Sequence, residues 1–321
     1  MDGLKDPYTE RFEVPVAGGM LNVVRAGVPP EEADAVVLGI HGLTSSLMIW
    51  RTVARELSRR TRICLLAPDL RGRGRSADLP GPYGFDAHVA DLLAVLDHVG
   101  APRAVLAGHS LGAYIAAYLA ARHPARAAAV VLADSGLPFR HVPKGDPAEV
   151  VEQAFGAAIG RLRMTFDSTE EYVARWRSHP AFARAFQPGF MHAWDDDLET
   201  YARYDVTGDR GAVRCVVSEA AVMADSEEML VDESTRTALD HVHAPIVLLR
   251  ASRGVNGYDL PLIARHQVLR FAAEHPDAYI QDVWGVNHYT LVLGPALGSR
   301  RVATALSRAA RLADTAARSV A

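Results

Sequence analysis

The sequence predicts an α/β fold built on a largely parallel sheet, and two observations support this prediction. Four short runs are apolar at nearly every position, which is typical of parallel strands covered on both faces. These runs are AVVLGIHG (35–42), RICLLAPDL (62–70), RAVLAGHS (103–110) and AAAVVLADSG (127–136). Segments with helical periodicity separate them, at 47–60, 86–99 and 111–122. This alternation predicts crossover helices between parallel strands.

The alternation is interrupted in the middle of the chain. From about Leu137 to about His241 the pattern is mostly helical, and no clear strand appears. Before the first apolar run, a pair of strands turns at residues 17–19. After the interruption the pattern resumes with 244–252 (strand), 260–274 (helix), 277–289 (strand) and 299–318 (helix). We therefore predict a core domain of residues 1–136 and 242–321, with a helical insertion at 137–241.

The composition of the 321 residues is that of an ordinary soluble globular protein, with 49% hydrophobic and 22% charged residues. The net charge of −4 gives no reason to expect binding to nucleic acid or to an anionic membrane. The first residues lack the apolar segment of a signal peptide. Cys64 and Cys215 do not make a disulfide framework, so we expect a cytoplasmic protein.

A serine between two glycines marks the junction of a predicted strand and a predicted helix. Gly108-His109-Ser110-Leu111-Gly112 follows the apolar run at 103–110 and opens an alanine-rich helical segment. A GxSxG sequence in this context is typical of a sharp turn that lifts a nucleophilic serine above the sheet. A helix cap is the simpler interpretation of Ser110. We favour the nucleophile because of the flanking glycines and the position.

A nucleophilic serine needs backbone N–H donors for the oxyanion and a base for its proton. The sequence predicts the donors as the N–H groups of Leu43, in a loop after a strand, and of Leu111, at a helix start. We interpret the side chain of His41 as structural. The candidate base is His288, which follows the last strand in an apolar loop, whereas most other histidines fall in predicted helices or on the surface.

Four segments together resemble the α/β-hydrolase superfamily, in particular its serine esterases and lipases with a helical cap. They are HGLTSS (41–46), PDLRGRGRS (68–76), GHSLG (108–112) and VNHYTLVLG (286–294), in the order and spacing of that family. The resemblance implies a mostly parallel eight-stranded sheet with helices on both faces and a Ser–acid–His triad. It also implies that the insertion at 137–241 is the cap. Epoxide hydrolases and haloalkane dehalogenases of this fold use an aspartate at the turn, so Ser110 argues against their chemistry.

The acid of the implied triad is the position at which this sequence departs from the family. The family most often carries an aspartate after the seventh strand, in a pattern such as R-G-x-x-D, but here Gly254 stands four positions after Arg250. Asp259 is the nearest carboxylate. Asp134, at the end of the sixth strand, is the second candidate, and some family members carry the acid there. An aspartate at the end of a buried strand needs a partner, which favours Asp134.

These residues predict a serine hydrolase that cleaves a carboxylester, a lactone or a thioester through an acyl-enzyme on Ser110. The partner is then a small molecule with an ester-type bond. No GxGxxG follows the early strands and no metal-ligand cluster is evident, so we expect no cofactor and no metal. Two alternatives remain open: an acyltransferase or biosynthetic tailoring enzyme that uses the same acyl-enzyme, and a receptor-like protein that binds a ligand and retains the triad.

Overall fold

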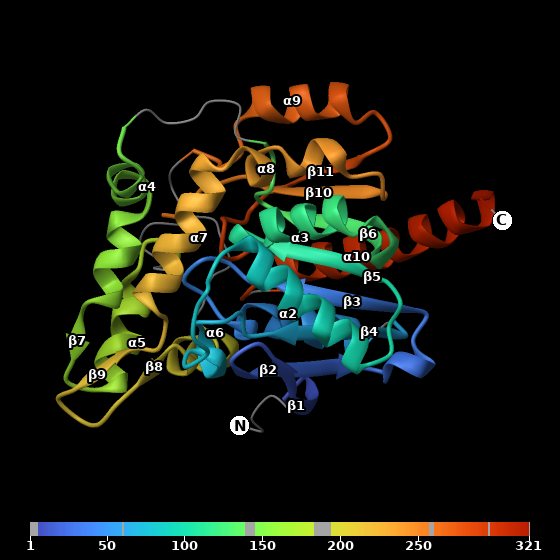
Figure 1. The fold of residues 1–321 in the computed structure, drawn as a ribbon. Coiled ribbons are helices and arrows are strands. Elements are labelled where there is room, and N and C mark those ends of the chain that lie inside the picture. The colour runs from blue at the N-terminus through green and yellow to red at the C-terminus, as the bar shows by residue number, and fades with distance from the viewer. Residues whose placement is uncertain are drawn as a thin grey trace.

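An eight-stranded sheet forms the centre of the computed structural model, which describes residues 6–59, 61–138, 145–182, 194–256, 260–294 and 296–320 (Figure 1). Its strands are β1 (Tyr8–Val16), β2 (Gly19–Gly27), β3 (Ala35–Ile40), β4 (Ile63–Pro68), β5 (Ala104–His109), β6 (Ala127–Ala133), β10 (Ile246–Ala251) and β11 (Tyr279–Val283). Their order is β1-β2-β4-β3-β5-β6-β10-β11. Only β2 runs antiparallel to its neighbours among these strands. The predicted mostly parallel sheet is therefore confirmed.

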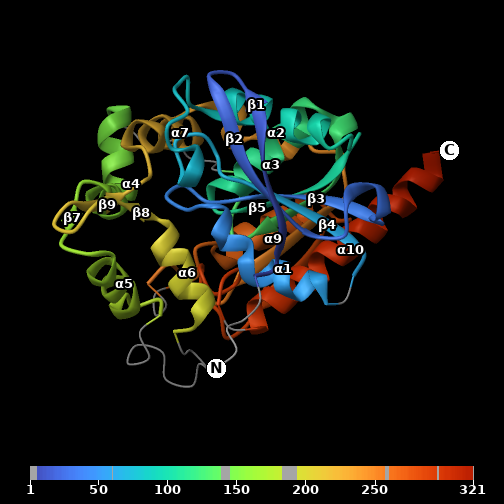
Figure 2. The same cartoon turned by 90° about the horizontal axis from the view of Figure 1, so that it is seen from below.

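Helices cover both faces of this sheet, because its buried strands are apolar on both sides. The helices are α1 (Arg51–Ser58), α2 (Phe85–His98), α3 (Leu111–Arg122), α9 (Arg265–Glu274) and α10 (Ala296–Val320). Figure 2 shows α2 and α3 on one face and α1 and α10 on the other. Alternate residues of β3 separate accordingly: Leu38 and Ile40 pack in the cluster with α2, α3 and α9, and Val37 packs in the cluster with α1 and α10.

Short 3₁₀ turns of the core lie at Pro30–Glu32, Leu47–Trp50, Gly74–Ser76 and Pro124–Arg126, and one at Ala238–His241 ends the inserted segment. Within the described residues, no helix combines the length and the apolar character needed to cross a membrane.

Most of the segment between β6 and β10 lies to one side of the sheet, at the left in Figure 1, whereas its last helix lies against α3. Its helices are α4 (Pro147–Leu162), α5 (Thr169–Ser178), α6 (Asp196–Tyr204), α7 (Glu219–Val231) and α8 (Glu233–Arg236). The expectation that this segment contains no strand is wrong. Three short strands, β7 (Thr165–Phe166), β8 (Val206–Thr207) and β9 (Val213–Cys215), form a small antiparallel sheet. Strands of two or three residues are too short to leave an alternating pattern in the sequence.

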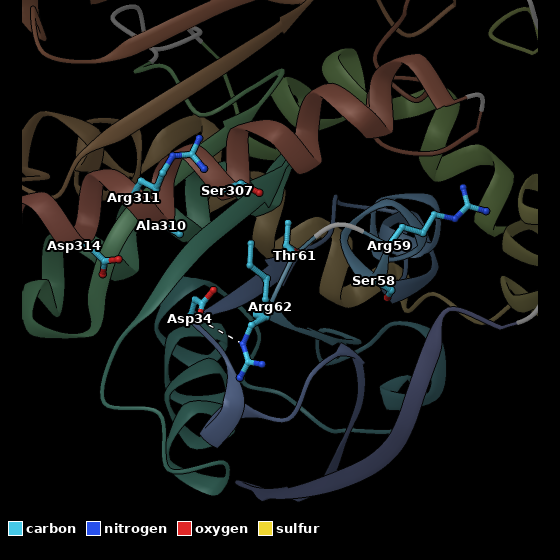
Figure 3. Close-up of a pocket in the computed structure, with 10 residues that line it drawn as sticks. Asp34, Ser58, Arg59, Thr61, Arg62, Ser307, Ala310, Arg311 and Asp314 are labelled. Atoms are coloured by element: carbon cyan, nitrogen blue, oxygen red, sulfur yellow. Dashed lines mark ion pairs between the residues drawn. The ribbon is translucent and has the colours of Figure 1, made fainter.

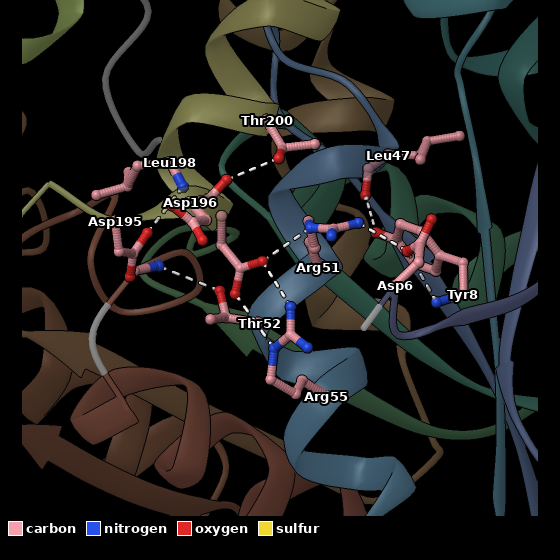
Figure 4. Close-up of polar contacts among 12 residues, drawn as sticks. Asp6, Tyr8, Leu47, Arg51, Thr52, Arg55, Asp195, Asp196, Leu198 and Thr200 are labelled. Atoms are coloured by element: carbon pink, nitrogen blue, oxygen red, sulfur yellow. Dashed lines mark hydrogen bonds and ion pairs between the residues drawn. The ribbon is translucent and has the colours of Figure 1, made fainter. Parts of the chain in front are cut away.

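Buried ion pairs attach this segment to the core. Arg51 and Arg55 extend from α1 toward α6 (Figure 4). The buried carboxylate of Asp197, in the first turn of α6, accepts hydrogen bonds from Arg51 Nε at 2.8 Å and from Arg55 Nη2 at 2.7 Å. Removing one partner of such a buried pair typically costs about 3–5 kcal/mol. The position of α6 relative to the sheet is therefore strongly specified.

Candidate active site

Ser110 occupies a strained turn between β5 and α3, at the edge of the sheet where the parallel strands end. Its backbone angles are φ 57° and ψ −125°, a conformation that costs energy for any residue with a side chain. The flanking glycines permit the turn. A Cβ atom on Gly108 would lie 2.1 Å from the carbonyl oxygen of Gly112, and one on Gly112 would lie 2.2 Å from that of Ile40. The predicted turn at 108–112 is therefore present, with close packing that only glycine permits.

Asp134 is the other strained residue at this edge. In the described part of the chain, Ser110 and Asp134 are the two non-glycine residues with positive φ. The Asp134 side chain is fully buried, and its Oδ1 atom accepts a hydrogen bond from the N–H of Ala251 at 2.8 Å. Its Oδ2 atom accepts one from Nδ1 of His288, also at 2.8 Å. Burial raises the pKa of the Asp134 carboxyl, and the bond to His288 partly opposes this rise.

His288 is held from two sides in the loop after β11. Nε2 of the buried His109 donates to the carbonyl oxygen of His288 at 2.9 Å, and the N–H of His288 donates to the carbonyl oxygen of Gly254 at 3.4 Å. Burial and then the neighbouring His288 lower the pKa of His109, which keeps it neutral. Because Nδ1 of His288 donates to Asp134, its Nε2 atom is the nitrogen that can receive a proton.

One of the two candidate acids lies in the described part of the chain, beside His288. Asp134 is hydrogen-bonded to it. Asp259 lies outside the described residues. Gly254, which stands where the family usually carries its acid, contributes only a carbonyl group to the His288 loop.

Ser110 and His288 line the same cavity, which has a volume of about 420 Å³. Residues of the loop after β3 form one side of it, among them Gly42, Leu43 and Thr44. Side chains from α4, α5 and α6 form another side, including those of Phe155, Trp176 and Tyr201. The inserted segment therefore lies against the cavity that contains Ser110.

A comparison of the sequence with known families identifies a family of the same fold. The profile of the α/β hydrolase fold family matches residues 35–195, which is half of the chain. The chain belongs to the α/β-hydrolase fold family.

Curated relatives of this α/β hydrolase carry different activities. Lipase LipV of Mycobacterium tuberculosis is 44% identical over 114 residues, which cover 36% of this chain and 41% of the relative. Epoxide hydrolase A of the same organism is 37% identical over 151 residues, which cover 46% of this chain and 44% of the relative. The alignments thus span less than half the length of both relatives.

A solved structure supports the fold over nearly the whole chain. The crystal structure of E-2-(acetamidomethylene)succinate hydrolase aligns with a TM-score of 0.72 and covers 93% of this chain and 99% of that one. The sequence identity is 21%, so this similarity concerns the fold alone.

Side chains hold three consecutive carbonyl groups of the loop that faces Ser110. Nδ1 of His41 donates to the carbonyl oxygen of Gly42 at 2.9 Å. Nε of Arg73 donates to that of Leu43 at 3.1 Å, and Nη2 of Arg161 donates to that of Thr44 at 3.2 Å. With its carbonyls fixed, the loop presents its N–H groups in a defined direction.

Buried partners keep these three side chains in place. Nε2 of His41 accepts a hydrogen bond from the N–H of Leu70 at 2.9 Å, and burial lowers the pKa of His41 to about 3. His41 therefore stays neutral and holds the loop, in agreement with its structural interpretation. Arg73 pairs with Asp225 at 2.6 Å, and Arg161 pairs with Asp205 at 2.6 Å.

The N–H groups of Leu43 and Leu111, the predicted oxyanion donors, have no acceptor among the described residues. Leu43 lines the cavity with Ser110, and Leu111 begins α3 directly after it. Free donors at a helix start and in a fixed loop are suited to bind a developing negative charge.

Sequence reasoning missed Arg73, Arg161 and His109 as supports of the site. Arg73 lies within a recognisable motif, RGRGR, and His109 lies within the GxSxG sequence. Arg161 lies in the inserted segment without any local signal. Among the described residues, no group of three histidine, cysteine or acidic side chains is arranged to hold a metal ion.

Proposed function

We propose that this α/β hydrolase is a serine hydrolase that cleaves a carboxylic ester, lactone or thioester through an acyl-enzyme on Ser110. The observation that carries the proposal is a single cavity lined by Ser110 and His288, with His288 hydrogen-bonded to the buried Asp134 at 2.8 Å. Nucleophile, base and orienting acid are the components that acyl transfer at a serine requires.

The proposed reaction begins when Oγ of Ser110 attacks the acyl carbon while Nε2 of His288 takes its proton. The leaving alcohol or thiol departs with that proton, and the acyl group stays on Ser110 as an ester. A water molecule, deprotonated by His288, then releases the acid and restores the serine. Asp134 holds Nδ1–H of His288 and stabilises the imidazolium that forms in both steps.

The N–H groups of Leu43 and Leu111 are the proposed donors to the oxyanion of each tetrahedral intermediate. Such donors stabilise the transition state most when they are already oriented before the reaction. The hydrogen bonds to the carbonyls of Gly42, Leu43 and Thr44 supply this orientation on one side of the site. The start of α3 supplies it on the other.

A serine at the turn favours acyl transfer over the opening of an epoxide, although Epoxide hydrolase A is among the relatives. Attack of a serine on an epoxide would leave an ether, which water does not readily cleave. Attack on an ester leaves another ester, which does hydrolyse. Ser110 is therefore matched to acyl substrates, as the name of the relative Lipase LipV also suggests.

We further propose that residues 137–241 act as a cap over the serine. The cavity side chains from α4, α5 and α6 support this role. A cap limits the access of bulk water, which strengthens the interactions of charged groups inside the site. The cavity side chains of the inserted segment then determine which substrates fit beside Ser110.

Turnover of 4-nitrophenyl acetate tests the proposal. We expect a burst of nitrophenol followed by steady hydrolysis, and a loss of at least about 10³-fold in kcat in Ser110→Ala. Ser58→Ala is the control, because Ser58 lies at the end of α1 and does not line the cavity. Turnover that survives in Ser110→Ala contradicts the proposal. Analysis of products with added alcohol then distinguishes hydrolysis from acyl transfer.

A further inference from the structure

The cavity beside Ser110 has a one-sided charge. Among the described residues that line it, Arg161 and Arg175 are cationic and none is acidic. Its remaining ionisable lining residues are the histidines His109, His179 and His288 and the tyrosines Tyr201 and Tyr289. A cleft lined by one sign of charge concentrates ligands of the opposite sign.

The two arginines differ in whether an acidic side chain neutralises their charge. Arg161 is mostly buried, and its guanidinium pairs with Asp205 at 2.6 Å and also contacts Tyr172 and the carbonyl of Thr44. Its charge is neutralised by Asp205, and its donors hold the loop after β3. Arg161 therefore has a structural role in the wall of the cavity.

Arg175, on α5, lines the cavity from an exposed position and has no such partner. In the described part of the chain its guanidinium makes no ion pair and no hydrogen bond. Its neighbours contrast with it: Arg177 pairs with Glu199, and Arg203 pairs with Glu170 at 3.0 Å and with Glu199 at 2.9 Å. One cation at the cavity thus has no protein partner, whereas Arg161, Arg177 and Arg203 are paired.

Aromatic side chains line the same cavity as this cation and Ser110. Trp176, Tyr289 and Phe155 line the cavity, and the rings of Trp176 and Tyr289 lie 5.8 Å apart in an edge-to-face arrangement. Such a wall accommodates an uncharged chain or ring by contact with apolar surface. The cavity therefore combines the proposed acyl-transfer centre, apolar side chains and a guanidinium without a protein partner.

We propose that the substrate is an ester-type compound that carries a separate carboxylate, and that Arg175 binds this carboxylate while the scissile carbonyl lies at Ser110. The inference rests on the proposed function, since it places the carbonyl at Ser110. A planar guanidinium matches a carboxylate through two parallel hydrogen bonds. One uncompensated cation corresponds to one additional negative charge on the substrate.

Pairs of esters that carry a second carboxyl group, free in one member and methylated in the other, test this assignment. On the acyl side, 4-nitrophenyl hydrogen adipate is compared with its methyl ester, and on the alcohol side 4-acetoxybenzoate is compared with methyl 4-acetoxybenzoate. We expect kcat/KM to favour the carboxylate member of at least one pair by about tenfold or more, the range of a charge-assisted hydrogen bond. The preference should weaken as ionic strength rises.

The Arg175→Gln variant should reduce the ratio of kcat/KM within the preferred pair by at least about tenfold, mainly through KM. Arg177→Gln is the matched control, because Arg177 lies on the same helix, pairs with Glu199 and does not line the cavity. The control should keep the wild-type ratio.

Two results overturn the inference: equal or better use of the neutral esters in both pairs, or a carboxylate preference that Arg175→Gln leaves unchanged. These results differ from failure of the proposed function. If Ser110-dependent hydrolysis of the neutral esters persists, only the carboxylate assignment is wrong. If no ester in either pair is hydrolysed, the proposed function itself fails.

Discussion

Two hollows lie at opposite ends of the parallel strands, and the larger one is not the candidate site. The hollow at the amino ends of β3 and β4 has a volume of about 640 Å³ and is lined by Asp34, Arg62 and Arg311, among others (Figure 3). The cavity that contains Ser110, at the carboxyl ends of the strands, has a volume of about 420 Å³.

The charged groups of the two hollows differ in burial. Asp34 and Arg62 lie 3.7 Å apart, and their side chains are 75% and 61% exposed. Asp134 is fully buried, and it holds His288 at 2.8 Å. Water screens an exposed pair, so it contributes little, whereas a buried pair interacts strongly. Burial, convergent polar groups and strained backbone therefore indicate a site better than volume does.

Replacing aspartate by asparagine at each end of the parallel strands should give the largest difference in kcat. Asp134→Asn should lower kcat by up to about 10⁴-fold while the fold is kept, because the histidine loses the partner that sets its tautomer. Asp34→Asn is the matched control and should leave kcat unchanged and stability within about 0.5 kcal/mol. Steady-state kinetics and thermal unfolding of both variants measure these effects.

The Asp259→Asn variant sharpens this test. We expect it to retain activity, because Asp134 already occupies the Nδ1–H of His288. A large loss in Asp259→Asn, together with an active Asp134→Asn, would show that the acid is misassigned.

Packing at the serine can be disturbed without touching a polar group. A Cβ atom on Gly42 would lie 2.9 Å from Cβ and 3.5 Å from Oγ of Ser110. Gly42→Ala should therefore displace the nucleophile and lower kcat by about 10- to 100-fold. Gly160→Ala, on α4, is the control: apart from its chain neighbours and its own helix backbone, no atom lies within 4 Å of the added methyl group, and the variant should stabilise the helix by up to about 1 kcal/mol. Equal kcat in both variants would contradict the assigned geometry.

The neutral, buried His41 predicts sensitivity to mild acid. Its pKa is about 3 in the folded protein, against about 6.5 in an unfolded chain. Unfolding therefore takes up a proton between these values, so this stability is present above about pH 6.5 and is lost as the pH falls. The expected slope is about 1.4 kcal/mol per pH unit.

Urea denaturation between pH 6 and pH 4 measures this effect. His41→Gln should reduce the pH slope of the unfolding free energy by about 1.4 kcal/mol per unit, with His123→Gln, at an exposed position, as the control. An unchanged slope in His41→Gln would mean that His41 is not held in the neutral form.

The features that local sequence determines could be predicted. Apolar runs locate the parallel strands because both faces of the sheet are covered, and two glycines around Ser110 locate the turn because no larger residue fits there. The acid stayed open between Asp134 and Asp259. The choice depends on the contact of Asp134 with Ala251 and His288, which are 117 and 154 residues away in the chain.

The supports of the site could not be predicted for the same reason. Arg73 reaches Asp225 and Arg161 reaches Asp205, and both carboxylates lie in the inserted segment. Sequence alone shows these residues as charges, which usually lie in solvent. Only the packing of the insertion against the core reveals that they are buried and hold the carbonyls of Leu43 and Thr44.

Labelling with a fluorophosphonate tests the central claim, that the smaller cavity holds a nucleophilic serine at the carboxyl end of the sheet. The reagent forms a stable adduct with an activated serine, and peptide mass spectrometry locates it. The account predicts one adduct, on Ser110, that is absent in Ser110→Ala and strongly slowed in Asp134→Asn. An adduct on another residue, or labelling that persists in Ser110→Ala, would contradict it.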